Sequence, residues 1–265
     1  MNEKEYRAAD GISRSELWKI HESPEKFKWA QEHPEPPTPA LIFGQLVHKL
    51  LLQPENFSDE FVIAPNVDRR TKAGREEWAK FEAENTEKTA LSEDIYNIAL
   101  KMVNDCLAAP YVKKLLAGQK EIPYFWTDDM TGEKCKVRLD CLTEVGDDLI
   151  IIDYKTTTNA ETDTFIKSAI KYGYDFQAAM YIEGVKKCTG KKPRFVFIAQ
   201  EKDPPYAVNI MQADELFIKR GYDSFRELLG TYHDCKINNN WFGYLGKYNI
   251  LNSLCLPSYL AAEVE

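Results

Sequence analysis

The sequence predicts a mixed α/β (α+β) fold, with a central mixed β-sheet that contains an antiparallel meander and is flanked by helices. Apolar residues recur mainly at helical spacing through residues 1–118, whereas period-two alternation and short apolar runs begin after residue 119. Along the chain, the order is helices, meander, helices, strands and a last helix. This order favours a sheet sandwiched between helices, with a helical N-terminal region beside it.

The N-terminal region carries clear signals for where its helices begin and end. Ser13 or Ser15 can cap a helix through Ile20, and Pro24 can open a second helix that ends near Gln31. Prolines in residues 33–39 predict a connector. Helical spacing then predicts three further helices, over about 40–52, 74–84 and 92–108.

The central region reads as strands joined by tight turns. Strands are expected over 122–126, 134–142 and 149–155, and Gly132 and Gly146 mark the turns of an antiparallel meander. The rest of the chain predicts helices over 161–171, 175–188 and 213–232, with strands over 194–200 and 206–211 between them. The aromatic tail, 238–265, contains Trp241, Phe242, Tyr244 and Tyr248, so we expect it to pack on the body or on another subunit.

Length and composition are those of an ordinary globular protein, with 265 residues, 44% hydrophobic and 29% charged. We expect one domain over 1–265, divided into a helical part (1–118), a sheet core (119–212) and a C-terminal helix with its tail (213–265). No apolar run approaches the roughly 20 residues of a membrane helix, and the N-terminus lacks a secretory core. These features predict a cytoplasmic protein without a membrane partner.

Charge and cysteine content narrow the classes of function. The net charge of −8 argues mildly against indiscriminate coating of nucleic acid, although a local basic groove can coexist with it. One candidate groove segment holds Arg69, Arg70, Lys72 and Arg75; a second, over 186–194, is better explained as solvated surface. The six cysteines form no CxxC pair, so we expect reduced thiols, and neither a zinc site nor an iron–sulfur cluster.

The strongest chemical signal is the run Leu149-Ile150-Ile151-Ile152-Asp153-Tyr154-Lys155. On a strand, Asp153 and Lys155 project to the same side. Asp140, on the preceding strand, can lie beside Asp153 across a hairpin. Neighbouring carboxylates repel unless a cation compensates, and a hard divalent ion is the usual cation. The alternative is that Asp140 is a hairpin-end acid paired with Arg138.

Two helical pairs accompany this signal. Gln177 and Tyr181 stand four residues apart and so share one helix face, where they need hydrogen-bond partners. Gly44 and His48 share another face, and the glycine would let a backbone or ligand approach closely. By spacing alone, both pairs could also be satisfied core residues.

Taken in order, these residues resemble the PD-(D/E)XK nucleases of the RecB-like branch, and most closely the RecE-type exonuclease VIII domain of prophage recombination modules. The resemblance covers most of residues 10–260. It rests on Gly44-Xaa-Xaa-Xaa-His48, Glu121, Arg138-Leu139-Asp140, Ile152-Asp153-Tyr154-Lys155 and Gln177-Xaa-Xaa-Xaa-Tyr181. Ile12-Ser13-Arg14-Ser15-Glu16-Leu17, Pro24-Glu25-Lys26-Phe27, residues 43–54 and residues 69–74 support it.

The resemblance implies a restriction-endonuclease-like core and a role for each residue. Asp140 and Asp153, with the Tyr154 carbonyl, would bind magnesium or manganese, Glu121 would place a metal or its water, and His48 would lie beside the cluster. Lys155 would orient or deprotonate the attacking water and stabilise charge. Gln177 and Tyr181 would position Lys155 and the scissile phosphate.

The resemblance further implies degradation of double-stranded DNA from its ends, 5′ to 3′, which leaves a single strand for an annealing recombinase. It also implies a homo-oligomer, because ring-shaped assemblies occur in this group. Two alternatives use the same residues: an endonuclease, and a nuclease-fold module that binds DNA without cutting it.

Overall fold

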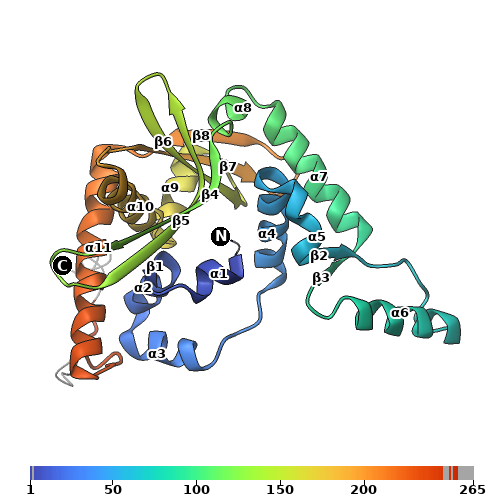
Figure 1. Cartoon of the computed structure of the whole chain (residues 1–265), viewed down its shortest axis with the longest axis horizontal. Helices are drawn as coiled ribbons and strands as arrows, with labels where there is room; N and C mark the ends of the chain where they lie inside the picture. Colours follow the sequence, from blue (N-terminus) through green and yellow to red (C-terminus); the bar gives the residue numbers. More distant parts are fainter. Residues whose placement is uncertain (2, 247–250, 252, 256–265) are drawn as a thin grey trace.

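The computed structural model describes residues 1, 3–246, 251 and 253–255. The fold is built on a six-stranded mixed sheet (Figure 1). The strand order is β1-β5-β6-β7-β8, and β4 pairs with β5 off this path. The strands are β1 (Ile12–Ser13), β4 (Gln119–Thr127), β5 (Lys134–Val145), β6 (Asp148–Thr157), β7 (Arg194–Glu201) and β8 (Val208–Gln212). Two short strands, β2 (Phe61–Ile63) and β3 (Thr89–Leu91), form a separate parallel pair.

The predicted meander is confirmed, because β4, β5 and β6 pair antiparallel in succession. β6 then pairs parallel with β7, and β7 pairs antiparallel with β8, so the sheet is mixed. The parallel step requires a crossover between β6 and β7, and the helices α9 (Thr162–Lys171) and α10 (Tyr174–Thr189) supply it.

Helices cover both faces of the sheet and bury a separate apolar core on each. Above one face, α9 and α10 pack with α2 (Arg14–Glu22), α3 (Pro24–Glu32) and α11 (Glu215–Asn238) around the first core. Over the other face lie α4 (Pro39–Leu52), α7 (Glu93–Ala108) and α8 (Val112–Leu115) with the second core. The remaining helical segments are α1 (Glu3–Ala8), η1 (Pro54–Asn56), α5 (Phe57–Glu60) and α6 (Lys72–Glu84).

Most predicted helix boundaries agree with the structure. Ser13, rather than Ser15, caps α2, and its backbone N–H donates to Glu16 Oε2 at 2.9 Å in a capping box. Pro24 occupies the first turn of α3, and the Ser92 hydroxyl accepts from the Ile95 N–H at the start of α7. Within the described chain, no helix has the length and apolar character needed to cross a bilayer.

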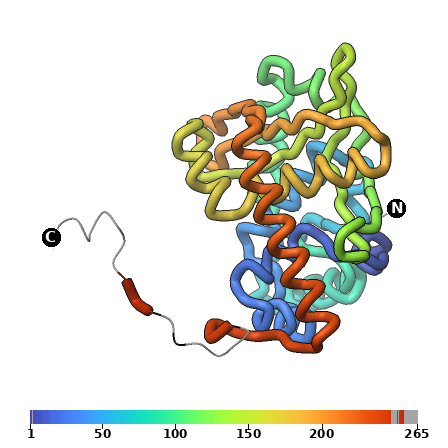
Figure 2. The backbone as a smooth tube through the Cα atoms, turned by 90° about the vertical axis from the view of Figure 1, so that its left-hand side faces the viewer, coloured from blue at the N-terminus to red at the C-terminus, as the bar shows by residue number. Residues whose placement is uncertain are grey.

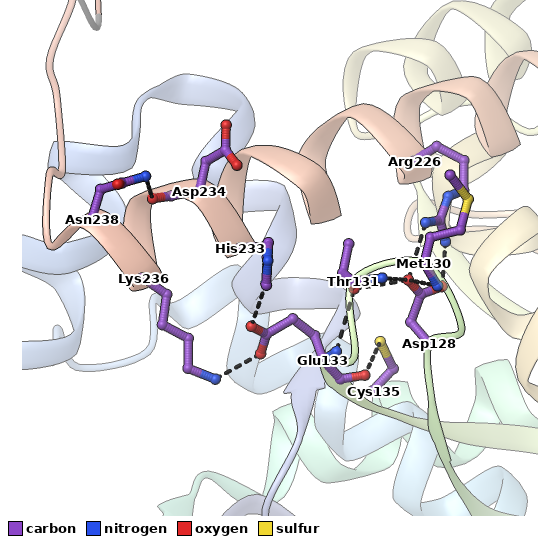
Figure 3. A network of polar contacts seen from close by, with 10 residues as sticks. All are labelled: Asp128, Met130, Thr131, Glu133, Cys135, Arg226, His233, Asp234, Lys236 and Asn238. Atoms are coloured by element: carbon purple, nitrogen blue, oxygen red, sulfur yellow. Dashed lines mark hydrogen bonds and ion pairs between the residues drawn. The ribbon is translucent and has the colours of Figure 1, made fainter.

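α11 continues to Asn238 instead of ending near Tyr232, and polar contacts across the molecule explain why. Its last turns carry His233 and Lys236, whose side chains hold Glu133 at 2.9 and 2.6 Å (Figure 3). Figure 2 shows α11 running along the long side of the molecule. The pairing with Glu133 stabilises turns that lack a long apolar stripe.

The beginning of the aromatic tail packs on the body, as expected from its composition. Trp241 stacks on Phe27 with ring centroids 5.3 Å apart, and the Phe242 carbonyl accepts from the Glu25 N–H at 3.1 Å. Tyr248 lies outside the described residues.

The sequence does not predict α1 or β1, because a six-residue helix and a two-residue strand leave no periodic pattern.

Candidate active site

Three acids form a row across three neighbouring strands. β5 and β6 pair in a register whose last partners are Cys141 and Ile152, so Asp140 and Asp153 lie opposite each other where the strands diverge. On the other side of β5, Lys120 pairs with Cys141 and Ile122 with Leu139, which brings Glu121 level with Asp140.

Glu121 holds its place in the row with an unusual backbone conformation. Its φ of 54° lies in the left-handed region, where a glutamate is rare and strained. The paired residues on either side keep their register, so the distortion is confined to this one position. A strained residue directly beside another site acid is typical of a functional position.

α4 brings His48 over the first two acids of the row. His48 Nε2 lies 3.1 Å from Asp140 Oδ1, and His48 Nδ1 lies 3.5 Å from Glu121 Oε1. The helix also turns Gly44 toward β6, where an added Cβ would lie 3.4 Å from Thr156 Oγ1. That separation is ordinary van der Waals contact, so packing against the sheet does not require glycine at this position.

Asp153 contacts two protein side chains in this arrangement. Its Oδ2 lies 2.5 Å from Lys155 Nζ, and its Oδ1 accepts from the Gln177 side-chain amide. Gln177 is thus bonded to the acid that pairs with Lys155, and its role in positioning Lys155 and the scissile phosphate stays a prediction. Lys155 Nζ also lies 5.0 Å from the centre of the Tyr174 ring, a cation–π contact on its other side.

Tyr154 contributes its backbone to the site and its side chain to the second core. Its N–H donates to Asp140 Oδ2 at 2.8 Å, which fixes the carboxylate across the point where the strands part. On the opposite face, its hydroxyl donates to Gln200 Oε1 at 2.6 Å. Both contacts fix β6 beside the acids.

Arg138 closes the row on the outer side. Its Nε lies 2.8 Å from Glu121 Oε2, and its guanidinium also pairs with Glu3 from α1. The alternative in which Asp140 serves as the partner of Arg138 is therefore wrong, because Glu121 and Glu3 hold that guanidinium while Asp140 faces His48.

Burial and mutual repulsion shift the pKa values of the site. Burial, offset in part by Lys155 and reinforced by Asp140, raises the pKa of Asp153 to about 6. Burial also raises the pKa of Glu121. For His48, burial lowers the pKa but the Asp140 and Glu121 carboxylates outweigh it, so its pKa rises. The pKa of Asp140, in contrast, is lowered, because His48 and Lys155 outweigh the effect of its burial.

The donor set fits a divalent cation. One donor atom from each of His48, Glu121 and Asp140 lies within 4.8 Å of the others, and carboxylate oxygens are the ligands that hard cations prefer. Asp153 stands next in the row, with its oxygens turned to Lys155 and Gln177. These residues could hold a metal between β4, β5 and α4.

Tyr181 and the four predicted basic residues lie outside the row of acids. Tyr181 is partly buried and packs against the first core, its ring 6.2 Å from that of Phe195; burial, reinforced by Asp153, raises its pKa well above the ordinary value. The four basic candidates lie in and before α6, which projects away from the sheet (Figure 1). There they contact local partners: Arg69 with Trp78, Arg70 with Asp68, Arg75 with the Arg70 carbonyl, and Lys72 with Glu76.

Three residues near the acids were not among the predicted site residues: Tyr174, Arg138 and Arg14. Arg14 donates to the Gly173 carbonyl at 2.9 Å, and its guanidinium lies over the Trp18 ring at 5.5 Å. Burial lowers its pKa, opposed by Tyr181 and Asp153. Tyr174 precedes Gln177 by one helical turn, and Arg138 is two residues from Asp140. Their closeness in sequence to predicted site residues is the feature that could have identified them.

The sheet, its flanking helices and this row of acids define a nuclease fold of the PD-(D/E)XK type. The chain belongs to the family described as PDDEXK-like domain of unknown function (DUF3799), whose model matches residues 13–253. No curated protein sequence matches the chain.

Among solved structures, the chain is similar to a protein from Eubacterium rectale named "Putative exonuclease". The TM-score is 0.65 at 16% identity, over 97% of this chain and 96% of the other. A second structure, SSO0001, is 12% identical with a TM-score of 0.39, over 85% and 81% of the two chains, and supports no argument. The first likeness confirms the predicted fold.

Proposed function

We propose that the protein is a metal-dependent deoxyribonuclease that hydrolyses double-stranded DNA from its ends, 5′ to 3′. The observation that carries the proposal is the row of Glu121, Asp140 and Asp153 with His48 above it and Lys155 beside it. The exonuclease name of the similar structure supports the choice of DNA ends. The proposal treats the chain as one nuclease domain that acts as a homo-oligomer and hands its product strand to an annealing recombinase.

Each residue of the row has a proposed part in this reaction. Asp140, Asp153, the Tyr154 carbonyl, Glu121 and His48 would hold magnesium or manganese, which lowers the pKa of bound water and stabilises charge on phosphate oxygens. Burial lowers the pKa of Lys155, but Asp153 and Asp140 outweigh it and raise the pKa. A protonated Lys155 is suited to stabilise the pentacoordinate phosphate. Gln177, which is bonded to Asp153, and Tyr181 would position Lys155 and the scissile phosphate.

The test is a time course on end-labelled linear duplex, with magnesium and with chelator. The parent should digest the duplex only with metal, and Lys155→Ala should lower the rate by a factor of about 100 or more. Lys167→Ala, an exposed lysine on α9, is the matched control and should leave the rate unchanged.

Labels on the 5′ and 3′ ends report polarity, and closed circular DNA reports the need for an end. Cleavage of the circle at the linear rate would favour the endonuclease alternative. Duplex binding without any metal-dependent cleavage would favour the silent binding module. Equal rates in the parent and Lys155→Ala would refute the proposed function.

A further inference from the structure

The short helix α1 lies between α4 and the β1–α2 segment in Figure 1. Glu3 pairs with Arg138, the same guanidinium that holds Glu121. The Tyr6 ring centre lies 5.3 Å from the Arg138 guanidinium carbon and 6.2 Å from the Phe125 ring. The segment therefore covers the outer side of the site.

α1 is held mainly by polar contacts. None of its six residues, Glu3–Ala8, is buried. Lys136 Nζ binds the carbonyls of Arg7 and Ala9 at 3.0 and 2.6 Å, and Lys4 pairs with Glu87 at 2.7 Å on the open surface. A single helical turn or two has little stability of its own, and exposed ion pairs add little. A ligand that competes for these contacts could displace α1.

The charges around Arg138 indicate which ligand would compete. The ion pairs here join four carboxylates to three permanent cations and one histidine: Glu3, Glu121, Asp140 and Asp153 with Arg7, Arg138 and Lys155, and with His48. Of the four acids, Glu3 alone comes from α1. A guanidinium binds carboxylate and phosphate oxygens with the same geometry. Glu3 therefore stands where a phosphate could bind.

We propose that Arg138 is a binding residue for a DNA backbone phosphate, and that the Glu3 carboxylate of α1 covers it in the free protein. DNA then exchanges a phosphate for Glu3 on the guanidinium while Arg138 keeps its contact with Glu121. This inference rests on the proposed function, because it concerns how the same site receives its substrate.

The experiment measures binding of a labelled linear duplex by fluorescence anisotropy in chelator, where no cleavage is expected. Glu3→Gln should bind about fivefold more tightly than the parent, which is equivalent to about 1 kcal/mol. Arg138→Gln should bind more weakly, with a slope of log affinity against log salt that is shallower by about 0.9. In the Arg138→Gln background, Glu3→Gln should have no effect.

Glu87→Gln is the matched control. It frees the outer contact of α1 but leaves the carboxylate on Arg138, so its affinity should stay within about twofold of the parent. Tightening by Glu87→Gln equal to that by Glu3→Gln would show that loosening α1 is enough, and would overturn the inference.

Two further outcomes separate this inference from the proposed function. The inference alone is overturned if the parent cleaves duplex through Lys155 but Glu3→Gln binds duplex no more tightly than the parent. The same holds if Glu3→Gln tightens binding equally in the parent and in the Arg138→Gln background. If the parent neither binds nor cleaves duplex, both are overturned.

Discussion

At the scale of single residues, the site depends on buried charges whose partners come from other elements. Asp153 is 1% exposed, and Gln177, at 5% exposed, donates to its Oδ1 from α10. A buried carboxylate oxygen without a donor costs much more than an exposed one, because water cannot replace the bond. Gln177 is therefore expected to stabilise the folded protein as well as to orient Asp153.

We expect Gln177→Met to lower the free energy of unfolding by about 1–3 kcal/mol, since it removes the amide donor and keeps the length of the side chain. Urea unfolding at pH 7 in chelator measures the effect. Lys186→Met, at an exposed position of the same helix, should change it by less than about 0.5 kcal/mol. Equal stabilities of the two variants would contradict this role.

Some of these residue positions could be predicted, and others could not. Asp140 and Asp153 follow from counting back from the Gly146 turn, because a tight hairpin fixes the register. The left-handed φ of Glu121 could not be predicted, since local preference disfavours it and only its tertiary contacts with His48 and Arg138 compensate. The Glu3–Arg138 pair joins residues 135 positions apart and has no local signal.

At the scale of elements, the turn between β4 and β5 is fastened to α11 by buried charges (Figure 3). Asp128 accepts from Arg226 of α11 and from the Thr131 hydroxyl at 2.8 Å, and its side chain is 4% exposed. Burial raises the pKa of Asp128, but the bonds from Arg226 and Thr131 outweigh it and hold the pKa well below its usual range. The turn therefore anchors the two strands that carry Glu121 and Asp140.

We expect Asp128→Asn to lower the free energy of unfolding by about 3 kcal/mol at pH 7, because it leaves Arg226 without its buried counter-charge. A lowered pKa means that the carboxylate stabilises the fold fully above its ordinary pKa of about 3.9 and progressively less below it. The difference in free energy of unfolding between the parent and Asp128→Asn should therefore be about 1 kcal/mol smaller at pH 3 than at pH 7.

Urea unfolding of both proteins at the two pH values measures this gap. Asp129→Asn is the control, since Asp129 is the next residue, pairs with Lys187 and is 75% exposed. Its effect should stay below about 0.5 kcal/mol at both values. If the difference in free energy of unfolding between the parent and Asp128→Asn does not change with pH, the charge on Asp128 is not what stabilises the fold.

Among the elements, length decided what the sequence could predict. The long strands and helices, such as β5 and α7, carry enough periodic residues to be recognised. α11 was predicted too short because its last turns are held by His233 and Lys236 on Glu133, a pairing between residues about a hundred positions apart. β1 depends entirely on its parallel partner, β5.

At the scale of the whole molecule, the acids lie where the two apolar cores meet. Along β5, the side chains of Val137 and Leu139 point into the first core, whereas that of Cys141 points into the second. The alternation of side chains between the two faces of the sheet is therefore interrupted at Asp140. α4 brings His48 from the second core, and α10 brings Gln177 from the first. A cation held by this row would therefore link elements from both sides of the sheet.

This placement predicts that metal binding stabilises the entire fold. Magnesium or manganese at about 100 times its dissociation constant would add about 2.7 kcal/mol and raise Tm by about 5 °C. The shift, measured by thermal unfolding against sodium chloride of equal ionic strength, should disappear with chelator and in Asp140→Asn. An equal metal-induced shift in parent and Asp140→Asn would place the cation elsewhere and contradict the site.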